Sequence, residues 1–440
     1  MKKFKIENRI VSNSMWMIAE RILQMCISLV VNAMVNRYLG PDNNGLITYC
    51  ASYVNMCTAF VTLGLEYIVI KELVSNPEAE GKIIGTSLVM RIVSSIACIV
   101  AIQGVVAVSR DFQAVYMTVT LLQSVSLVFK SAELIDFWFQ SKLNSKQVAI
   151  AKGITYFAVA GWRIFGLATA RSVEYFAFAT TLDALLVALI LLYMYQKAGG
   201  GSLSFDIHWV KRLLSQSCHF ILASMITVLY SEMDKLMLGN MLGDYDVGIY
   251  NGAYGVAMMW VFVPNAIMNS YRPAIVEGYT TKTNYLERVR TLYSIMIWLG
   301  IFVGIGMMLF SRPLIWLLCG PAYAGSAACL CILIWSTLFS HLSVARNTWM
   351  VCENLQRYSE IFPIWGVATN FVLNYLLIPR MGAMGASVAT LMTQVVVTLI
   401  APLFYKRVRP SVKHMTDAFF ARDLRDRLKG VIGKRDENRA

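Results

Sequence analysis

The sequence predicts an all-α polytopic membrane protein with about twelve transmembrane helices, arranged as two six-helix lobes. Three observations lead to this fold class. The chain is 57% hydrophobic and 15% charged, with a mean hydropathy of +0.56, whereas a soluble domain carries roughly 25% charged residues. Apolar segments of about 20 residues, the length that a helix needs to cross a bilayer, recur along nearly the whole chain. A short glycine motif also appears twice, at matching places in the two halves.

The apolar segments are expected to be helices, because a backbone in lipid must satisfy its hydrogen-bonding groups within the segment. The alternating pattern of a membrane β-barrel is absent from the sequence. The first segment follows a basic N-terminus, as in a signal peptide, but it contains Glu20 and Arg21 and lacks a small-residue cleavage site. We therefore expect an uncleaved helix. The expected spans are 13–36, 45–70, 83–108, 113–139, 149–168, 174–196, 213–238, 247–273, 287–311, 326–351, 359–378 and 383–405.

Lys and Arg residues separate sharply between the loops on the two sides of the membrane. With the N-terminus inside, the inside segments hold 27 basic residues and the outside loops hold 5. Basic loops stay on the cytoplasmic side, so both termini are predicted to be cytoplasmic. The net charge of +13 is mostly a topology signal, and it does not indicate nucleic-acid binding.

The repeated motif is L-G-x-x-x-x-G, at Leu39–Gly45 after the first span and at Leu242–Gly248 after the seventh. Its matching place in each half predicts two parallel six-helix repeats. The expected parts are an N-terminal lobe (1–196), a flexible cytoplasmic linker (197–212), a C-terminal lobe (213–405) and a basic cytoplasmic tail (406–440).

The tail holds 11 basic and 5 acidic residues. From Ser411 to Ile432 its apolar residues follow near-helical spacing, which is typical of an amphipathic helix lying on anionic headgroups. A merely solvated basic tail is the alternative. The apolar positions are Val412, Met415, Phe419, Leu424 and Leu428.

Seven basic residues are left over from the loop count and fall inside the expected spans, and seven of the acidic residues within the spans accompany them. A charge at the bilayer centre costs about 2.5–3.5 kcal/mol, so these side chains are expected to face a water-filled cavity, pair with each other or reach an interface. The basic residues are Arg21, Arg91, Lys130, Arg163, Lys235, Arg272 and Arg346; the acidic residues are Glu20, Glu66, Glu133, Asp136, Asp183, Glu232 and Asp234.

Arg21 and Arg91 are the strongest cavity candidates, because each lies about 12 Å inside its span and has no acidic residue three or four positions away. Arg272, Arg346 and Arg163 lie nearer to span ends and could extend to an interface instead. Two pairs of opposite charge stand three residues apart on one helix, and each forms either a structural ion pair or part of the cavity. They are Lys130 with Glu133 and Glu232 with Lys235.

Several short stretches together resemble one known family. They are Arg37–Pro41, Leu63–Leu65 followed by Lys71–Leu73, Met233–Gly239 followed by Val247–Tyr250, and Gly382–Thr390. In order and spacing they are similar to the polysaccharide flippases, the O-antigen and capsule repeat-unit translocases of the multidrug/oligosaccharidyl-lipid/polysaccharide exporter superfamily. The resemblance covers essentially the whole chain. It implies two six-helix lobes around a central cavity that opens alternately to each side of the membrane.

The resemblance implies a monomeric transporter in the bacterial cytoplasmic membrane that needs no cofactor, with coupling to an H⁺ or Na⁺ gradient as an added expectation. The implied substrate is an oligosaccharide repeat unit on a polyprenyl diphosphate, and the implied partners are membrane lipids, the polysaccharide polymerase and the chain-length machinery. Guanidinium groups bind such a diphosphate well. The diphosphate and cavity candidates are Arg21, Arg91, Lys130, Lys235, Arg346, Arg272 and Arg163. The sugar-contact candidates are Tyr230, Asn251, Tyr254, Asn265 and Asn269. The candidates for ion coupling or counter-ions are Glu20, Asp183, Asp234 and Glu232.

Two other functions stay open at this point. A cation-coupled multidrug exporter of the same superfamily would have the same helix count, and Glu20 in the first span suits it. A membrane enzyme of the polysaccharide pathway, a polymerase or an acyltransferase, would need a large outside loop or a reactive His in a span, and His341 is the one candidate. The chain has no P-loop, and its nine Cys and four His residues show no metal-binding spacing.

Overall fold

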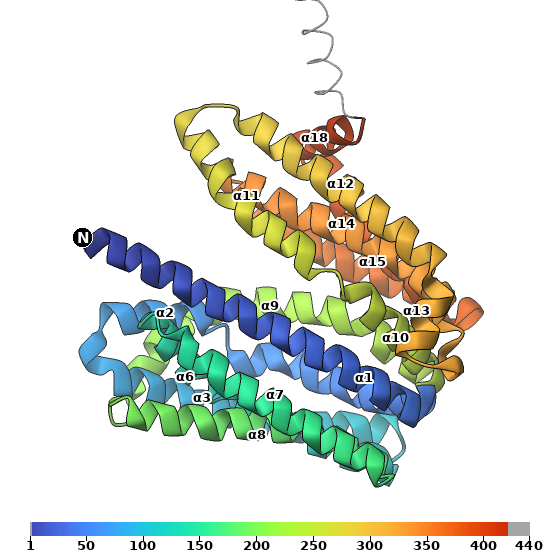
Figure 1. The fold of residues 1–440 in the computed structure, drawn as a ribbon, viewed down its shortest axis with the longest axis horizontal. Coiled ribbons are helices and arrows are strands. Elements are labelled where there is room, and N and C mark those ends of the chain that lie inside the picture. The colour runs from blue at the N-terminus through green and yellow to red at the C-terminus, as the bar shows by residue number, and fades with distance from the viewer. Residues whose placement is uncertain (1, 421–440) are drawn as a thin grey trace, which may run out of the picture. The chain divides into compact units, whose positions relative to one another are not determined.

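The computed structural model describes residues 2–420 of the 440-residue chain, and in that part it is helical throughout (Figure 1). The prediction of an all-α fold is confirmed. Within the described residues, nine helices are long and apolar enough to cross a membrane, or ten if the bent pair Asp244–Met258 and Phe262–Thr281 counts as one span. The segment Ala19–Ser75 counts once although it contains most of the first expected span and all of the second. The layout of twelve helices stays a prediction.

The chain divides into two compact units. Unit 1 comprises the residues up to Gly248 together with Leu318–Ala322, and unit 2 comprises Ile249–Leu317 and the residues from Tyr323 onward. The division expected from the helix count lay at the linker 197–212. The helix that follows that linker packs against the first and third helices of unit 1, so the seventh expected span belongs with the first six in the contacts that it makes.

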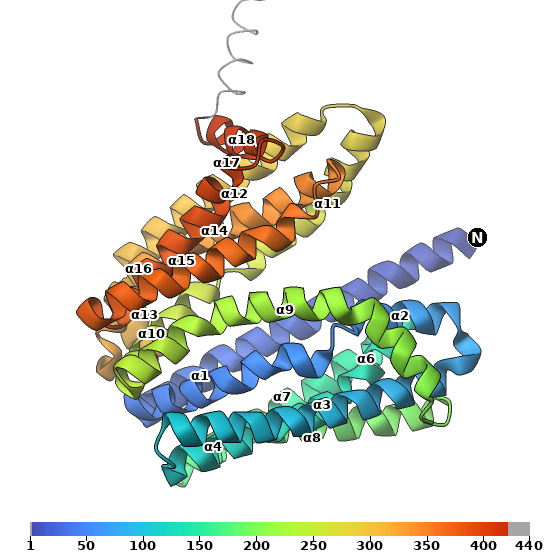
Figure 2. The ribbon, with the colours of Figure 1, turned by 180° about the vertical axis from the view of Figure 1, so that it is seen from behind.

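Unit 1 is a bundle of long helices with shorter pieces between them (Figures 1 and 2). Helix α1 is interrupted at Gly40, where φ is 71°, so it holds two helical segments. The elements are α1 (Lys2–Thr62), α2 (Glu66–Ser75), η1 (Pro77–Ala79), α3 (Glu80–Ser109), α4 (Ala114–Ser124), α5 (Ser126–Lys130), α6 (Glu133–Ser141), α7 (Ser145–Ala168), α8 (Val173–Lys197), α9 (Ile207–Met241) and the start of α10 (Asp244–Met258).

Unit 2 continues from α10 and closes around a core of α11, α12, α14 and the last helices. The segment η3 is a π-helix, which inserts an extra residue into a turn and frees backbone carbonyls from the α-helical pattern. The elements are α11 (Phe262–Thr281), α12 (Tyr285–Leu309), α13 (Ser311–Leu318), η2 (Pro321–Tyr323), α14 (Ser326–Cys352), α15 (Tyr358–Met381), α16 (Ala383–Val395), η3 (Val396–Ile400), α17 (Ala401–Leu403) and α18 (Arg409–Phe419).

The two glycine motifs pack directly against each other within unit 1. A Cβ atom at Gly45 would overlap the backbone carbonyl of Asp244, and a Cβ atom at Gly248 would overlap the backbone carbonyl of Pro41. In each case the last glycine of one motif meets the third residue of the other. The repeat predicted from the sequence is therefore also a reciprocal contact, and glycine is required there because the backbones approach so closely.

The glycine-rich linker, expected to be flexible, instead lies along the first turns of α3. The Ser204 amide donates to the Gly81 carbonyl oxygen over 3.2 Å, and the Asp206 amide donates to Thr86 Oγ1 over 3.0 Å. Side chains at Gly81 or Gly85 would collide with the backbone of Ser202 or Ser204. The linker lies against α3 because Gly81 and Gly85 let its backbone approach closely and Thr86 accepts its hydrogen bond, features that the linker's own composition does not reveal.

The part of the tail that the structure describes forms α18. Val412 and Met415, two of the predicted apolar positions, are buried, while Phe419 at the end of the helix is exposed. The other two, Leu424 and Leu428, lie outside the described residues. The buried face of α18 packs on α12 rather than standing free.

Candidate functional site

Arg91 on α3 is placed at a break between two helices. Its side chain is 1% exposed, and Nη2 donates to the Thr62 carbonyl oxygen over 3.3 Å, at the end of α1. Residues Leu63 and Gly64 leave the helical conformation there, both with positive φ. The guanidinium also lies 5.6 Å from the ring centroid of Phe137. Arg91 therefore stabilises an exposed carbonyl and the negative end of a helix dipole.

Arg346 on α14 also donates to backbone carbonyls, here in the π-helical segment of unit 2. Its Nη1 donates to the carbonyl oxygens of Val397 and Thr398 over 3.2 and 2.9 Å. Nη2 donates to Ser343 Oγ over 3.1 Å, the guanidinium carbon lies 4.4 Å from the Phe362 ring centroid, and the side chain is 1% exposed. The hydrogen bonds of Arg346 therefore go to two backbone carbonyls and one Ser hydroxyl of its own unit.

A polar seam runs between α1 and α7 in unit 1. Tyr156 OH donates to Glu20 Oε1 over 2.6 Å, and Arg163 Nη1 donates to Asn32 Oδ1 over 2.8 Å. Glu20 and Asn32 are twelve residues apart on α1, a rise of about 18 Å. The seam therefore extends through much of the thickness of a bilayer core.

The α1 side of this seam contains residues that the sequence analysis did not single out. Gln24, Ser28, Asn32 and Asn36 recur every four residues, so they share one face of an otherwise apolar helix. Gln24 accepts a hydrogen bond from Arg21 Nη1 over 3.1 Å. The four-residue polar period was visible in the sequence and would have identified this face.

A pocket opens at the Glu20 end of the seam. Its volume is about 320 Å³, and it is rich in charged side chains. Lys152 Nζ lies 2.8 Å from Asp136 Oδ2. Neither Glu66 nor Glu133 makes a hydrogen bond or ion pair with another described residue. The charged residues that line the pocket are Glu20, Arg21, Glu66, Glu133, Asp136 and Lys152.

The pocket gathers several of the charges predicted in the N-terminal half, namely Glu20, Arg21, Glu66, Glu133 and Asp136. Asp183 on α8 is partly buried. Lys130 and Glu133, the pair expected from the three-residue spacing, form no ion pair with each other in the described part of the chain.

The predicted charges of α9 form a separate group in unit 1. Lys235 Nζ lies 2.9 Å from Glu232 Oε2, the pair expected from the three-residue spacing. Asn55 on α1 donates to Glu232 Oε1 over 3.3 Å. Glu232, Asp234 and Lys235 are all buried. The contact of Glu232 with Asn55 joins α9 to α1 within unit 1.

Arg110, expected only as a loop residue, contacts residues of α1, α4, α9 and α10 in unit 1. Its guanidinium carbon lies 4.2 Å from the ring centroid of Tyr49 and 4.6 Å from that of Tyr116. Nη2 donates to the Gly239 carbonyl oxygen over 2.9 Å and lies 3.4 Å from Asp244 Oδ1. A single Arg in a loop gave no sequence signal for this arrangement.

In unit 2, the predicted residues Asn265, Asn269 and Arg272 share one exposed face of α11. Their spacing of four and three residues places them one above another. None of the three makes a hydrogen bond or ion pair with another described residue. Three polar groups on the open face of a membrane helix are costly in lipid and indicate a water-filled surface.

The other predicted sugar contacts lie elsewhere. Asn251 and Tyr254 are half-buried on α10, and the Tyr254 ring stacks on Tyr250 with centroids 6.1 Å apart. Tyr230 is half-buried on α9. Of the five candidates, Asn265 and Asn269 share a face of α11, whereas Asn251 and Tyr254 lie on α10 and Tyr230 lies on α9 of unit 1.

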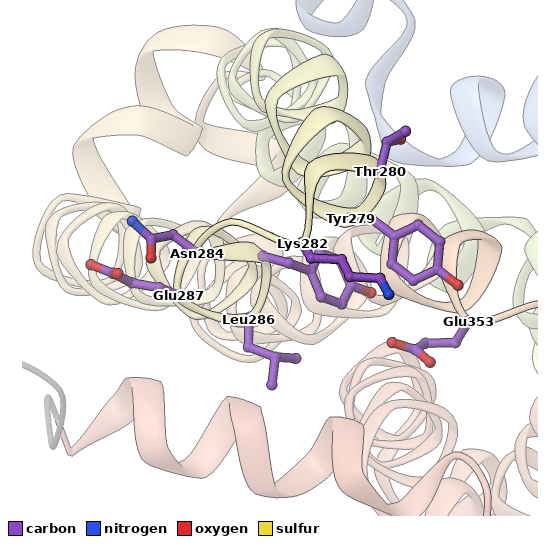
Figure 3. A pocket seen from close by; sticks show the side chains of 8 residues that line it. Tyr279, Thr280, Lys282, Asn284, Leu286, Glu287 and Glu353 are labelled. Atoms are coloured by element: carbon purple, nitrogen blue, oxygen red, sulfur yellow. The ribbon is translucent and has the colours of Figure 1, made fainter.

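A second pocket, of about 690 Å³, lies at the turn between α11 and α12 (Figure 3). The rings of Tyr279 and Tyr285 meet edge to face there, with centroids 5.2 Å apart. Figure 3 shows Tyr279, Lys282 and Glu353 gathered on one side of the hollow. Aromatic rings beside amide, carboxylate and ammonium groups offer both stacking surfaces and hydrogen-bonding groups to a polar ligand.

The described residues contain no group of three or more His, Cys, Asp or Glu side chains that could hold a metal ion. His341 is buried on α14 against the ring of Trp260, with centroids 5.3 Å apart. Neither of its ring nitrogens has a hydrogen-bond partner in the described part of the chain. It has no acid or hydroxyl partner there of the kind that a catalytic histidine requires.

Comparisons with known proteins agree with this architecture. The family model described as "Polysaccharide biosynthesis protein" matches residues 10–279, and the model described as "MatE" matches residues 220–376. The chain is 21% identical over 413 residues to the capsular polysaccharide biosynthesis protein CapF of Staphylococcus aureus, covering 90% of this chain and 100% of that one.

Two further proteins resemble the chain over most of its length. The putative O-antigen transporter of Escherichia coli is 21% identical over 382 residues, covering 84% of this chain and 90% of that one. The solved structure of the lipid II flippase MurJ in an inward closed conformation has a TM-score of 0.73 at 11% identity, covering 93% of this chain and 91% of that one. The fold is therefore shared with that protein.

Proposed function

The chain belongs to the polysaccharide biosynthesis protein family, and from that premise we propose that it is a flippase for a lipid-linked oligosaccharide repeat unit. It moves the polyprenyl-diphosphate-linked saccharide from the inner to the outer leaflet by alternating access. The relatives and the structural neighbours are named as transporters or biosynthesis proteins and not as enzymes. The product serves O-antigen, capsule or exopolysaccharide synthesis.

The observation that carries this proposal is the polar face of α11. Asn265, Asn269 and Arg272 expose two amides and a guanidinium on a helix of membrane length. Amides donate to and accept from sugar hydroxyls, and a guanidinium binds phosphate oxygens in pairs. Such a face suits a ligand with both a saccharide and a diphosphate.

Unit 1 contributes a second set of suitable groups. Arg21 lines the charged pocket, and Gln24 and Asn32 continue the polar face of α1 beyond it. Arg91 and Arg346 are occupied with backbone carbonyls, so we assign them a supporting role and place the diphosphate contacts on Arg21 and Arg272.

We assign ion coupling to the charged pocket of unit 1. Glu20, Glu66 and Glu133 line it, and Asp183 is partly buried on α8 of the same unit. Crowded carboxylates favour binding of H⁺ or Na⁺. Flip rates in vesicles that ignore both gradients would remove this part of the proposal.

The orientation follows from the basic loops: both termini lie in the cytoplasm and the protein spans the inner membrane many times. The polymerase and the chain-length machinery of the same pathway are the expected partners, and the protein acts as a monomer.

Complementation of a flippase-null strain tests the proposal. Wild type should restore surface glycan. At equal expression, Arg272→Ala and Arg21→Ala should fail and accumulate lipid-linked repeat units inside, and the Lys variants should recover part of the activity. Arg312→Ala is a matched control, because Arg312 is exposed on the short helix α13 and its side chain makes no hydrogen bond or ion pair with another described residue.

The MatE match over residues 220–376 keeps a cation-coupled drug exporter as the second candidate function. Drug resistance without restored glycan in any matched host would favour it over the flippase.

A further inference from the structure

The segment that follows the last membrane helix carries a cluster of cations, here called the basic patch: Lys406, Arg407, Arg409 and Lys413. All four side chains are exposed. None makes a hydrogen bond or ion pair within the described part of the chain. Four positive charges within eight residues repel one another, so an anion bound beside them would stabilise them.

The patch is held in a fixed place by α18. Ser294 Oγ on α12 donates to the Ala418 carbonyl oxygen over 3.0 Å, and Arg290 lies 3.9 Å from Asp417 Oδ2. The rings of Trp298 and Phe419 stack with centroids 6.2 Å apart and an angle of 3° between them. Figures 1 and 2 both show α18 beside α12.

Because α18 packs on α12, one face of α18 is buried and the opposite face is exposed. Val408, Val412 and Met415 are buried against the unit, while Arg409 and Lys413, one turn apart, point outward with Phe420. The apolar face that the sequence analysis assigned to lipid is thus used for packing within the protein. What remains outside is basic.

Exposed aromatic rings flank the cations. Phe404 is 67% exposed and Phe420 is 54% exposed. Phe404 follows directly on α17, the end of the last apolar segment, so the patch begins where the chain leaves the membrane. Trp and Tyr rings concentrate at that level of a bilayer, and Trp365, which stacks on Phe404 and donates to Tyr405 OH, supplies such a ring. Lys and Arg clusters next to a membrane helix bind anionic headgroups.

We propose that the basic patch is a binding site for anionic phospholipid headgroups of the phosphatidylglycerol class at the membrane surface beside α12. The site lies outside the polar faces assigned to the transported substrate. An acidic soluble protein would satisfy the charges but not the exposed rings at the membrane boundary, so the lipid is the better occupant.

Reconstitution of the full chain into phosphatidylcholine vesicles with increasing phosphatidylglycerol tests this site without any transported substrate. Brominated acyl chains quench Trp fluorescence on contact, and Trp298 and Trp365 stack on rings next to the patch. Quenching by brominated phosphatidylglycerol relative to brominated phosphatidylcholine gives the headgroup preference.

One Lys or Arg at an anionic surface contributes roughly fivefold in affinity. When all four patch residues are replaced by Gln, we expect the preference for phosphatidylglycerol to fall at least about tenfold below that of wild type. Salt at about 0.5 M should lower the wild-type preference in the same way, because it shortens the distance over which charges attract. The matched control replaces the exposed Lys71, Lys146, Lys197 and Lys211 of unit 1 by Gln and should keep the preference.

A protease-accessible C-terminal tag confirms that each variant keeps its orientation. An unchanged preference in the correctly oriented patch variant would overturn the proposal. A variant that kept the lipid preference but lost a co-purifying acidic protein would overturn it as well and assign the patch to that protein.

Discussion

Gly248 lies directly against the backbone carbonyl of Pro41, and the equivalent glycine of the other motif, Gly45, lies against the backbone carbonyl of Asp244. The two contacts are reciprocal across an internal repeat. They join the turn after the first membrane segment to the turn after α9, and they leave no room for a side chain at either glycine.

Replacement of Gly248 or Gly45 by Ala should therefore destabilise unit 1. The added methyl group meets backbone and cannot be accommodated by rotation of a side chain, and overpacking of this kind costs about 1–3 kcal/mol. Gly104→Ala is the control, because nothing lies within 4 Å of a Cβ atom at Gly104. Thermal unfolding of the detergent-purified proteins measures the effect; a Gly248→Ala transition equal to that of the control would contradict it.

Substitutions at Arg346 and at Arg272 should have different effects, the first on the stability of the protein and the second on transport. Arg346→Ala leaves the carbonyls of Val397 and Thr398 without their donor, at about 1–3 kcal/mol for each buried group. We expect a lower unfolding temperature and reduced expression, with partial recovery in Arg346→Lys.

Arg272→Ala should instead keep the wild-type unfolding temperature and lose glycan export, because Arg272 is exposed and contacts no described residue. The two measurements on the same preparations are unfolding temperature and surface glycan. Equal unfolding of the Arg346→Ala and wild-type proteins would show that the π-helical segment does not depend on this side chain.

The sequence predicted the helical class, and the three-residue spacing of Glu232 and Lys235 indicated the ion pair that the structure contains, because each leaves a local pattern of spacing. The repeat of two six-helix halves stays a prediction. It did not separate the roles of Arg91 and Arg346 from those of Arg21 and Arg272. All four are arginines in apolar segments, and the difference is a freed carbonyl on another helix. The amino-acid composition of Val396–Ile400 does not indicate that this segment forms a π-helix.

The linker illustrates the same limit. Its glycines predicted flexibility, since Gly-rich segments are flexible when nothing holds them. The residues that order it, Gly81, Gly85 and Thr86, are more than 100 positions away in the chain. A tertiary contact with a glycine groove cannot be read from either segment alone.

The linker contact gives a third prediction. In Gly85→Val the new side chain would meet the backbone of Ser204, so residues 199–206 should lift away from α3. Amide hydrogen exchange in this segment should rise at least tenfold, about 1.4 kcal/mol in the opening equilibrium. Gly161→Val serves as the control, since a Cβ atom at Gly161 meets nothing within 4 Å. Equal exchange in both variants would mean that the groove does not hold the linker.

The Arg110 junction gives the last prediction. The guanidinium carbon lies close to the rings of Tyr49 and Tyr116, which meet edge to face, and Nη2 reaches both Asp244 and the Gly239 carbonyl. Lys cannot replace it, because an ammonium group has no planar face to lie against an aromatic ring and holds its donors less rigidly. Arg110→Lys and Arg110→Ala should therefore both destabilise unit 1, by about 1.5–3 kcal/mol for a hydrogen-bonded charge.

A double-mutant cycle of Arg110→Ala with Asp244→Asn isolates the pair. A coupling energy of about 0.5–3 kcal/mol is expected for groups in one network, and it should change little with salt because both side chains are largely buried. Arg171→Ala, at an exposed side chain on another loop, should have no effect. Strict additivity in the cycle would assign the stabilisation to the stacked rings and the Gly239 carbonyl, since these contacts of Arg110 do not involve the Asp244 carboxylate.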